Sequence, residues 1–236
     1  MTLPFFYINE YDFSQKEIVL DEDTSRHVVQ VLRMKEGEKL NLTDGKGSLI
    51  TAEVIDAHKK HCSVKISDSQ LKTQDPRKVV IAISLLKNTS RFEWFLEKAT
   101  EIGISEIIPL ICERTEKQKF RFDRMKGICL SAMLQSQQCW LPELHEPVLY
   151  SDLVMKRFDE HRKMIAHCLE ENKEELAGLQ ISKLSNPLIV IGPEGDFTKN
   201  EIELALQNNF IPVSLGKTRL RTETAGIVAA TLLKLH

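Results

Sequence analysis

Two strand–loop–helix units follow one another at the end of the chain, and they constrain the fold more than any other feature. The first spans residues 187–207, PLIVIGPEGDFTKNEIELALQ, and the second spans residues 210–235, FIPVSLGKTRLRTETAGIVAATLLKL. In each unit a short apolar run ends at a glycine, Gly192 or Gly216, and a loop with charged side chains leads into a helix. In open α/β folds, ligands bind where such loops leave the carboxyl ends of strands. We therefore expect the two loops to form two walls of one pocket.

The residues of the first unit fit a buried strand and a capped helix. Leu188–Ile191 is a continuous aliphatic run, which is typical of a strand covered on both faces. Thr198 with Glu201 three residues later forms a capping-box pattern and predicts that a helix begins there. That helix should have one apolar face, formed by Ile202, Ala205 and Leu206.

The second unit combines a charged loop with an apolar helix. The loop, residues 215–221, holds one lysine and two arginines between elements that we predict to be buried. Charges are rarely buried without a partner, so this loop should bind one. Ordinary scaffold is the alternative for either unit taken alone. The final helix is apolar almost all round, and we expect it to be buried through its small residues Ala225, Gly226, Ala229 and Ala230.

Common nucleotide-binding motifs do not account for these loops. Gly216-Lys217-Thr218 is similar to the end of a phosphate-binding loop, but Ile211 stands where that motif requires a glycine. The chain has no G-x-G-x-x-G motif, so a dinucleotide fold of the usual kind is not expected. The predicted pocket therefore belongs to another α/β cofactor system.

Residues 1–72 are predicted to form a small β-barrel-like domain with one helix. Short strands on both sides of the glycine-containing turn 43–47 predict a hairpin. The polar stretch 67–76 is interpreted as a linker. A helix is predicted over residues 24–32, with Val28, Val31 and Leu32 at helical spacing.

Residues 73–236 show strands that alternate with helices, which predicts a mostly parallel sheet. Ser90 and Glu93 form a second capping-box pattern, and Gly103 is placed to end the helix that begins there. A further helix is predicted around Met125 and Ala132. The strands before the two C-terminal units are expected at residues 79–86, 106–111 and 164–169.

The composition narrows the class of protein. The net charge is −2 and the isoelectric point about 6.4, whereas nucleic-acid-binding modules are usually basic, so any RNA contact must use local patches. The five cysteines never form C-x-x-C, as expected of reduced thiols in a cytosol. Neither a membrane span nor a signal peptide is expected. No metal site is expected either, because His58, His61 and Cys62 lack further ligands at a recognisable spacing.

The pair of C-terminal motifs, IGPEGDFTKNEIE and VSLGKTRLRTETA, closely resembles the signature of the SPOUT class of methyltransferases. Within that class the chain is similar to the family that methylates N3 of a uridine in small-subunit (16S) ribosomal RNA. Weaker matches lie upstream, at residues 27–37, 44–47, 91–109, 135–136 and Pro142, so the resemblance spans nearly the whole chain. Family members often carry an arginine near Gln137 and Gln138, where this chain has two glutamines.

The resemblance implies a fold, a cofactor and partners. It implies an α/β fold with a SPOUT-type parallel sheet and a C-terminal trefoil knot in residues 73–236, preceded by a PUA-like β-barrel in residues 1–72 that is expected to bind RNA. S-adenosylmethionine is the expected cofactor, and 16S ribosomal RNA or the small ribosomal subunit is the expected partner. The protein should be a cytoplasmic homodimer without a metal. Trp94 lies off the apolar face of its predicted helix, and either a subunit interface or stacking on an RNA base would account for it.

Candidate site residues follow from the loops and from the resemblance. The cofactor is expected to contact backbone groups and apolar walls at His167, Cys168, Leu169, Ile191, Gly192, Glu194, Gly195, Leu215, Gly216, Arg219, Leu220, Arg221 and Thr224. Candidate phosphate contacts, for which simple surface solvation is the alternative, are Arg26, Arg33, Lys35, Lys46, Lys87, Arg91 and Lys98.

The predicted chemistry needs a proton acceptor and a cation. Removal of the uridine N3 proton creates an anion that a cationic donor aimed at a carbonyl oxygen would stabilise. Arg219 and Arg221 are the candidates, and Arg221 is favoured because it lies next to the predicted helix start. Glu194 or Glu223 could accept the proton. The alternative is a Glu–Arg ion pair that only fixes the two loops.

Two other functions remain open at this stage. One is a SPOUT methyltransferase that acts on another ribosomal or transfer RNA base or on a ribose 2′-hydroxyl. The other is a non-catalytic RNA-binding factor that keeps the fold but does not bind the cofactor. A comparison of modified nucleosides in ribosomal RNA with and without the protein distinguishes the first from uridine-N3 methylation. Calorimetry with S-adenosylmethionine distinguishes the second, because a non-catalytic factor should not bind the cofactor.

Overall fold

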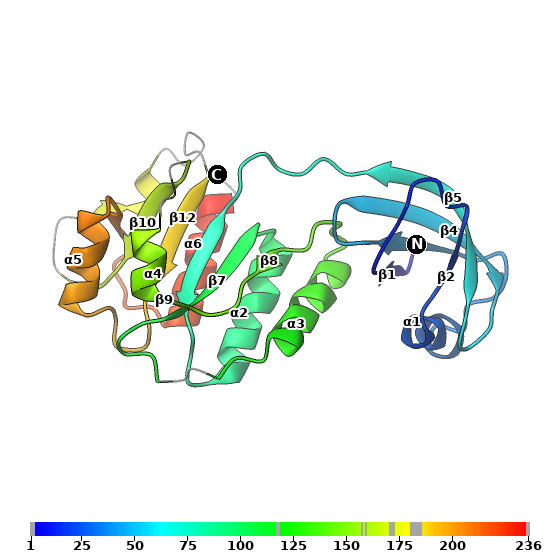
Figure 1. Cartoon of the computed structure of the whole chain (residues 1–236), viewed down its shortest axis with the longest axis horizontal. Helices are drawn as coiled ribbons and strands as arrows, with labels where there is room; N and C mark the ends of the chain where they lie inside the picture. The colour runs from blue at the N-terminus through cyan, green and yellow to red at the C-terminus, as the bar shows by residue number, and fades with distance from the viewer. Residues whose placement is uncertain are drawn as a thin grey trace. The chain divides into compact units, whose positions relative to one another are not determined.

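The computed structural model divides into two compact units, coloured along the chain in Figure 1. Unit 1 comprises Met1–Gln74 and Met133–Leu141, and unit 2 comprises Asp75–Ala132 and Pro142–His236. The structure describes residues 3–116, 119–156, 158, 160–169, 173–179 and 186–234.

The first unit is built on a five-stranded sheet in the order β1-β3-β4-β5-β2. β1 pairs with β3 in parallel, and the other neighbours are antiparallel. Alternating side chains of these strands enclose an apolar core that contains Leu40, Leu42, Ile50 and Val64. The strands are β1 (Phe5–Tyr7), β2 (Glu17–Val19), β3 (Lys39–Thr43), β4 (Ser48–Asp56) and β5 (Ser63–Leu71).

The predicted hairpin at residues 43–47 is confirmed, and one aspartate organises its turn. The Asp44 carboxylate accepts hydrogen bonds from the backbone N–H groups of Lys46 and Ser48 and from the Ser48 hydroxyl. Gly47 has a φ of +100°, and a Cβ there would lie 2.4 Å from the Trp140 ring. Only glycine therefore fits this position, for both conformational and steric reasons.

The structure corrects two predictions for the first unit in part. Residues 72–76 of the stretch interpreted as a linker form no strand and span the boundary between the two units, but its residues 67–71 belong to β5, where Ser69 and Gln70 pair with β4. Its polar composition reflects side chains on an exposed face rather than a loose chain. The predicted helix becomes α1 (Glu22–Arg26) followed by one π-turn, His27–Val31.

The π-turn explains why the predicted apolar face is not buried as a whole. The Leu32 N–H donates to the His27 carbonyl, five residues earlier, so the turn is wider than an α-helical one. Val28 is buried, whereas the wider turn leaves Val31 65% exposed and Leu32 43% exposed.

The second unit contains a parallel sheet in the order β11-β13-β10-β12-β6-β7-β8, with β9 also paired to β7. The predicted parallel sheet is thus confirmed. Two strands that are consecutive in the chain, β12 and β13, lie on opposite sides of β10. The trefoil knot that the resemblance implies stays a prediction. The strands are β6 (Val80–Ser84), β7 (Glu106–Ile111), β8 (Glu143–Leu144), β9 (Val148–Leu149), β10 (Arg162–Ala166), β11 (Glu174–Glu175), β12 (Pro187–Ile191) and β13 (Ile211–Ser214).

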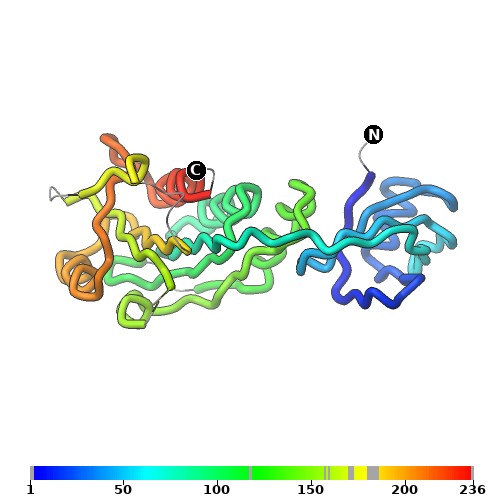
Figure 2. The backbone as a smooth tube through the Cα atoms, turned by 90° about the horizontal axis from the view of Figure 1, so that it is seen from above, coloured from blue at the N-terminus to red at the C-terminus, as the bar shows by residue number. Residues whose placement is uncertain are grey.

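Helices cover both faces of this sheet, and Figure 2 shows the layers from above. One face packs against α4 and α5 through a cluster that includes Tyr150, Ile165, Val190 and Ile202. The other face packs against α6 and α2, and a Cβ at Gly226 would lie 2.6 Å from the Phe95 ring. The helices are α2 (Thr89–Ile102), α3 (Phe122–Gln135), α4 (Tyr150–Met155), α5 (Lys199–Gln207) and α6 (Thr222–Lys234), with a 3₁₀ turn at Leu176–Gly178.

The helix boundaries test the predicted caps. The capping box of Thr198 and Glu201 is confirmed at α5, and Gly103 ends α2 with a φ of +87°. The other capping-box prediction was wrong, because α2 is capped two residues earlier by Asn88, whose side chain accepts from the Ser90 N–H.

Two predicted apolar faces also need correction. Leu206 of α5 is 39% exposed, and the partly buried Leu204 packs against the core instead. α6 is buried along one face only, at Gly226 and Ala229 among others, while Ala225 is half-buried. Among the described residues no helix is both long enough and apolar enough to cross a membrane.

Candidate active site

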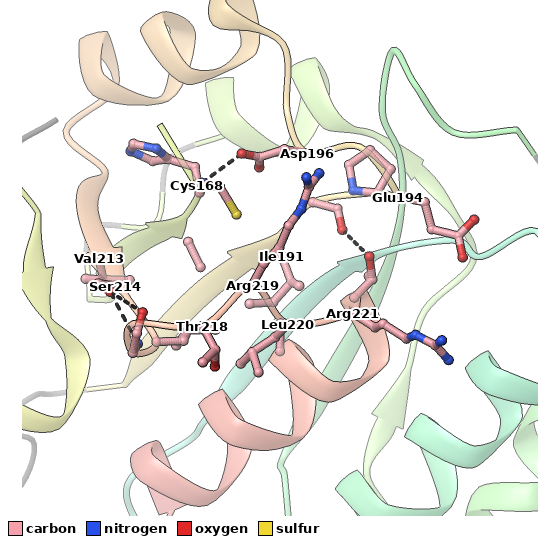
Figure 3. Close-up of a pocket in the computed structure, with 18 of the residues that line it drawn as sticks. Cys168, Ile191, Glu194, Asp196, Val213, Ser214, Thr218, Arg219, Leu220 and Arg221 are labelled. Carbon is pink, nitrogen blue, oxygen red and sulfur yellow. Dashed lines mark hydrogen bonds between the residues drawn. The ribbon is translucent and has the colours of Figure 1, made fainter. Parts of the chain in front are cut away.

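A cavity of about 700 Å³ lies at the carboxyl ends of β10, β12 and β13 (Figure 3). Its walls come from three segments, which follow these three strands. Residues 166–168 form one wall together with Lys173, residues 191–196 form the second, and residues 213–222 with Ala225 form the third. The two C-terminal loops thus face one cavity, as predicted from the sequence.

The first loop, Gly192–Phe197, is held by one of its own side chains, Asp196, and by Arg114 from another part of the chain. Asp196 has a φ of +72°, and its carboxylate accepts hydrogen bonds from the N–H of Cys168 at 2.7 Å and of Phe197 at 2.9 Å. Arg114 donates to the carbonyl oxygens of Gly195 and Asp196. A charged acceptor and a charged donor therefore fix the backbone of this loop.

The buried start of the first loop connects it to the second. Phe197 is buried and lies close to Gly192, where a Cβ would be 3.0 Å from the Phe197 ring. The Thr222 hydroxyl donates a 2.9 Å hydrogen bond to the Gly192 carbonyl. This bond links the first turn of α6 to the end of β12.

The second loop, residues 215–221, is more open. Gly216 has a φ of +126° with no other heavy atom within 4 Å of an added Cβ, and its N–H donates to the Ser214 hydroxyl. Lys217, Arg219 and Arg221 are all exposed, so the prediction that these charges are buried was wrong. Because the loop extends beyond the carboxyl end of β13, water solvates these three side chains. Within the described part of the chain no hydrogen bond or ion pair of these three side chains is found.

The third wall follows β10. The Cys168 side chain is exposed, but partial burial and the Asp196 carboxylate raise the pKa of its thiol, while Arg219 and Lys173 oppose the rise. His167 is buried, and its carbonyl accepts from the Lys173 ammonium at 2.9 Å.

A Glu–Arg ion pair, which was the alternative to a catalytic role, is present, but its arginine lies outside the two loops. Glu194 pairs with Arg91 of α2, with Nη1 to Oε1 at 3.2 Å, and not with Arg221. The Arg91 Nε also lies 3.7 Å from Oε1 of the buried Glu223. Figure 3 shows Glu194 and Arg221 extending to the same side, away from Cys168, whereas Arg219 extends over the cavity.

The structure brings together most of the predicted cofactor residues. Leu169 and Thr224 do not line the cavity: Leu169 packs against the apolar core, and Thr224 is half-buried in α6. The remaining predicted residues do line it: His167, Cys168, Ile191, Gly192, Glu194, Gly195, Leu215, Gly216, Arg219, Leu220 and Arg221.

Sequence reasoning missed several cavity residues, above all Asp196. Asp196 directly follows Gly195 in a loop that begins at the end of a strand. This pattern was a usable signal, because aspartate side chains in turns often accept hydrogen bonds from backbone N–H groups. The other missed residues are Ala166, Lys173, Pro193, Val213, Ser214, Lys217, Thr218, Thr222 and Ala225.

The candidate phosphate contacts are surface residues, and several already have anionic partners. Arg26 pairs with Glu22 and Asp23 of its own helix, and Lys87 pairs with Glu116 at 2.6 Å. Lys98 similarly pairs with Glu97 and Glu101. RNA contact by these side chains would have to replace such pairs. The other exposed candidates are Arg33, Lys35 and Lys46.

The two glutamines at the position of the family arginine lie beyond α3. Gln137 has a φ of +56°, and the Gln138 amide donates to the Ser136 hydroxyl.

At the amino ends of β7 and β8, the side chains of Glu106, Glu143 and His145 converge within 4.8 Å, with His145 Nε2 2.8 Å from Glu106 Oε1. These residues lie at the end of the sheet opposite to the cavity.

Comparison with known proteins agrees with this architecture. Residues 73–234 match the RNA methyltransferase domain family, and residues 20–67 match the RNA methyltransferase PUA domain. The chain is 31% identical to ribosomal RNA small subunit methyltransferase E of Rickettsia conorii, over 97% of this chain and 94% of the relative.

Solved structures agree as well. A probable rRNA methyltransferase from Porphyromonas gingivalis has a TM-score of 0.88 at 35% identity and covers 99% of both chains. A ribosomal RNA small subunit methyltransferase E from Neisseria gonorrhoeae, bound to S-adenosylmethionine, has a TM-score of 0.88 at 28% identity, over 99% of this chain and 97% of that one. The chain therefore belongs to the ribosomal RNA small subunit methyltransferase E family.

Proposed function

We propose that this protein transfers a methyl group from S-adenosylmethionine to N3 of a uridine in the 16S RNA of the small ribosomal subunit. The observation that supports the proposal most is the cavity at the ends of β10, β12 and β13, formed by the two motifs that carry the family resemblance. Ligand cavities in α/β proteins form at such strand ends.

The residues of the cavity fit S-adenosylmethionine. The volume of about 700 Å³ is within the range of roughly 300–1,000 Å³ that is usual for ligands of this size. Ile191, Leu215 and Leu220 supply apolar surface for an adenine ring, and the open space at Gly216 lets a ligand approach the backbone. When bound, the cofactor supplies an electrophilic methyl group on its sulfonium.

The side chains on the outer side of the cavity suit the uridine. In our proposal a carboxylate, Glu194 or Glu223, accepts the N3 proton, because either lies beside the loops. Arg221 then donates to a uracil carbonyl oxygen and stabilises the anion. The proposal assigns Arg219, which extends over the cavity in Figure 3, to the cofactor.

We further propose a division of labour between the two units. The PUA-like unit would bind ribosomal RNA through local basic residues such as Arg33 and Lys35, and unit 2 would carry the chemistry. The protein would act in the cytoplasm, where ribosomal subunits are assembled. Residues 73–236 alone should then still bind S-adenosylmethionine in calorimetry but should methylate RNA poorly compared with the intact chain.

A homodimer is also part of the proposal. Trp94, 43% exposed on α2, offers apolar surface for a second copy of the chain. Light scattering of the intact protein should give twice the monomer mass of 27.0 kDa. A mass of one chain for fully active protein would contradict this part of the proposal.

The decisive experiment is a methylation assay with the purified protein, labelled S-adenosylmethionine, and either 16S RNA or small subunits from cells that lack this modification. Mass mapping of the product should place the label on N3 of one uridine. A label on another base or on a ribose would support a different RNA specificity. No label together with no cofactor binding in calorimetry would favour a non-catalytic RNA-binding factor.

A further inference from the structure

One guanidinium connects the two carboxylates that could accept the proton. Arg91 is the third residue of α2, and its side chain is 34% exposed. Its Nη1 donates to Oε1 of Glu194 at 3.2 Å, and its Nε lies 3.7 Å from Oε1 of Glu223. Glu194 belongs to the first loop and Glu223 to the first turn of α6, so Arg91 bridges two of the elements that form the cavity.

The Glu223 side chain is the buried end of this bridge. It is only 9% exposed, and its Oε2 has no hydrogen-bond partner among the described residues. A buried carboxylate oxygen without a partner is costly, although the amino end of α6 stabilises its charge in part. The only cation found in contact with this carboxylate, within the described ranges, is Arg91.

The Glu194 side chain is the exposed end. It is 45% exposed, and in the described part of the chain its one observed contact is Arg91. The loop backbone is fixed by Asp196 and Arg114, but neither contacts the Glu194 carboxylate. Without Arg91, the Glu194 side chain would be free to rotate into solvent.

Two carboxylates share one guanidinium in this group, and the other cations nearby are Lys87, Arg114 and Arg221. Lys87 is paired with Glu116, and Arg221 extends to the same side as Glu194 (Figure 3). Among the described residues Arg91 is the cation found in contact with both carboxylates, which favours its fixed position.

We propose that Arg91 is a positioning residue: anchored by the buried Glu223, it holds the Glu194 carboxylate in place on the outer side of the cavity. Part of this inference rests on the proposed function, because it makes Glu194 the group that contacts the substrate. It assigns Arg91 to the reaction rather than to the phosphates of the RNA.

The positioning itself can be tested without substrate or cofactor. Hydrogen exchange of the Asp196 amide, which donates to the Pro193 carbonyl at 3.0 Å, reports on the stability of the first loop. Arg91→Met should accelerate this exchange about two- to fivefold, the scale set by losing a partly exposed ion pair. Arg91→Lys should restore part of the protection, because it restores the charge.

The matched control is another arginine that pairs with α2. Arg124 binds Glu93 of α2, with Nε to Oε1 at 2.6 Å, and does not contact the first loop. Arg124→Met removes a comparable ion pair and should leave the exchange of the Asp196 amide unchanged. Equal exchange in wild type and in Arg91→Met, or equal acceleration by both variants, would overturn the positioning role.

Kinetics then test whether the positioning serves the reaction. Arg91→Met should lower kcat about tenfold with less than about a twofold change in the dissociation constant of S-adenosylmethionine. In a Glu194→Gln background the same change should lower kcat by less than about twofold, because Arg91 acts through Glu194. Full additivity of the two changes would overturn the inference.

Glu223→Gln completes the test, since it keeps the shape of the anchor but removes its charge. It should lower kcat in the same direction as Arg91→Met and to a smaller extent. A wild-type rate in this variant would show that Glu223 does not anchor Arg91. If wild-type protein gives no methylated uridine, the proposed function fails instead, and the exchange experiment still decides the positioning role.

Discussion

The two loops that form the cavity differ in how they are held. The backbone of the first loop is fixed by its own Asp196 and by Arg114 from another part of the chain. Phe197, at the end of this loop, is buried. In the second loop the side-chain hydrogen bonds found among the described residues are local, between Ser214 and Gly216. Its cationic side chains are exposed.

This difference suggests different tasks for the two loops. A rigid wall keeps backbone groups at fixed positions, which favours binding of one ligand in one orientation. An open wall with unpaired cations can adapt when an anion or a polar base arrives. We therefore expect changes in the first loop to alter stability and cofactor affinity together, and changes in the second to alter catalysis more than stability.

The largest effect is expected in the open loop. Arg221→Ala should lower kcat by about 10²-fold or more, the scale for loss of one donor that stabilises developing charge. Because Arg221 is exposed and no partner is found for it in the described ranges, the melting temperature should change by less than about 2 °C. A single-turnover assay with a thermal melt measures both. A large loss of stability with an unchanged rate would reverse the roles that we assign to the two loops.

A smaller effect is expected in the fixed loop. Asp196→Asn keeps a residue type that tolerates positive φ but removes the charge that accepts from the Cys168 and Phe197 N–H groups. It should cost about 1–2 kcal/mol of unfolding free energy and should weaken cofactor binding about tenfold. Urea unfolding and calorimetry measure these effects. Ser214→Ala, in the second loop, is the matched control and should change both quantities much less.

The sequence predicts a contact between two residues more readily when they lie close together in the chain. The capping box of Thr198 and Glu201 was predictable because its two residues lie within one turn. The two loops and their shared cavity were predictable from the order of strands and helices. The Arg114 contacts with the first loop were not, because a pair separated by about eighty residues leaves no local pattern.

Other misses came from patterns with two readings. Ser90 and Glu93 match a capping box, but Asn88 two residues earlier offers its own cap, and Glu93 binds Arg124 instead. The polar alternation of residues 67–71 fits an exposed strand as well as a linker, and only the pairing with β4 decides. Composition shows that a segment is solvated, but not which neighbour it pairs with.

Two glycines provide a closer comparison of the loops. Gly195 and Gly216 have φ values of +93° and +126°, so alanine is strained at both. The first loop is fixed by Arg114 and cannot relax, so Gly195→Ala should cost about 1 kcal/mol. The open second loop can change its backbone angles, so Gly216→Ala should cost clearly less. Equal losses in urea unfolding would mean that the second loop is as rigid as the first.

The smallest effect is expected at the far end of α6, and it tests whether the open loop influences the rest of that helix. The Lys234 ammonium donates a 2.6 Å hydrogen bond to the Asp75 carboxylate, and this bond is the main reason why the pKa of Asp75 is lowered. A lowered pKa contributes stability at pH values above that of an unfolded aspartate, about 3.8, and the contribution disappears as the pH falls through the folded value. Since Asp75 is 41% exposed, Lys234→Met should cost only about 0.5 kcal/mol at pH 7 and less at pH 3. Urea unfolding at the two pH values measures the difference.

Cofactor affinity should not change in Lys234→Met, because this ion pair lies twelve residues beyond the start of α6 and contacts neither loop. A changed affinity would show that the second loop and the end of the helix move as one body.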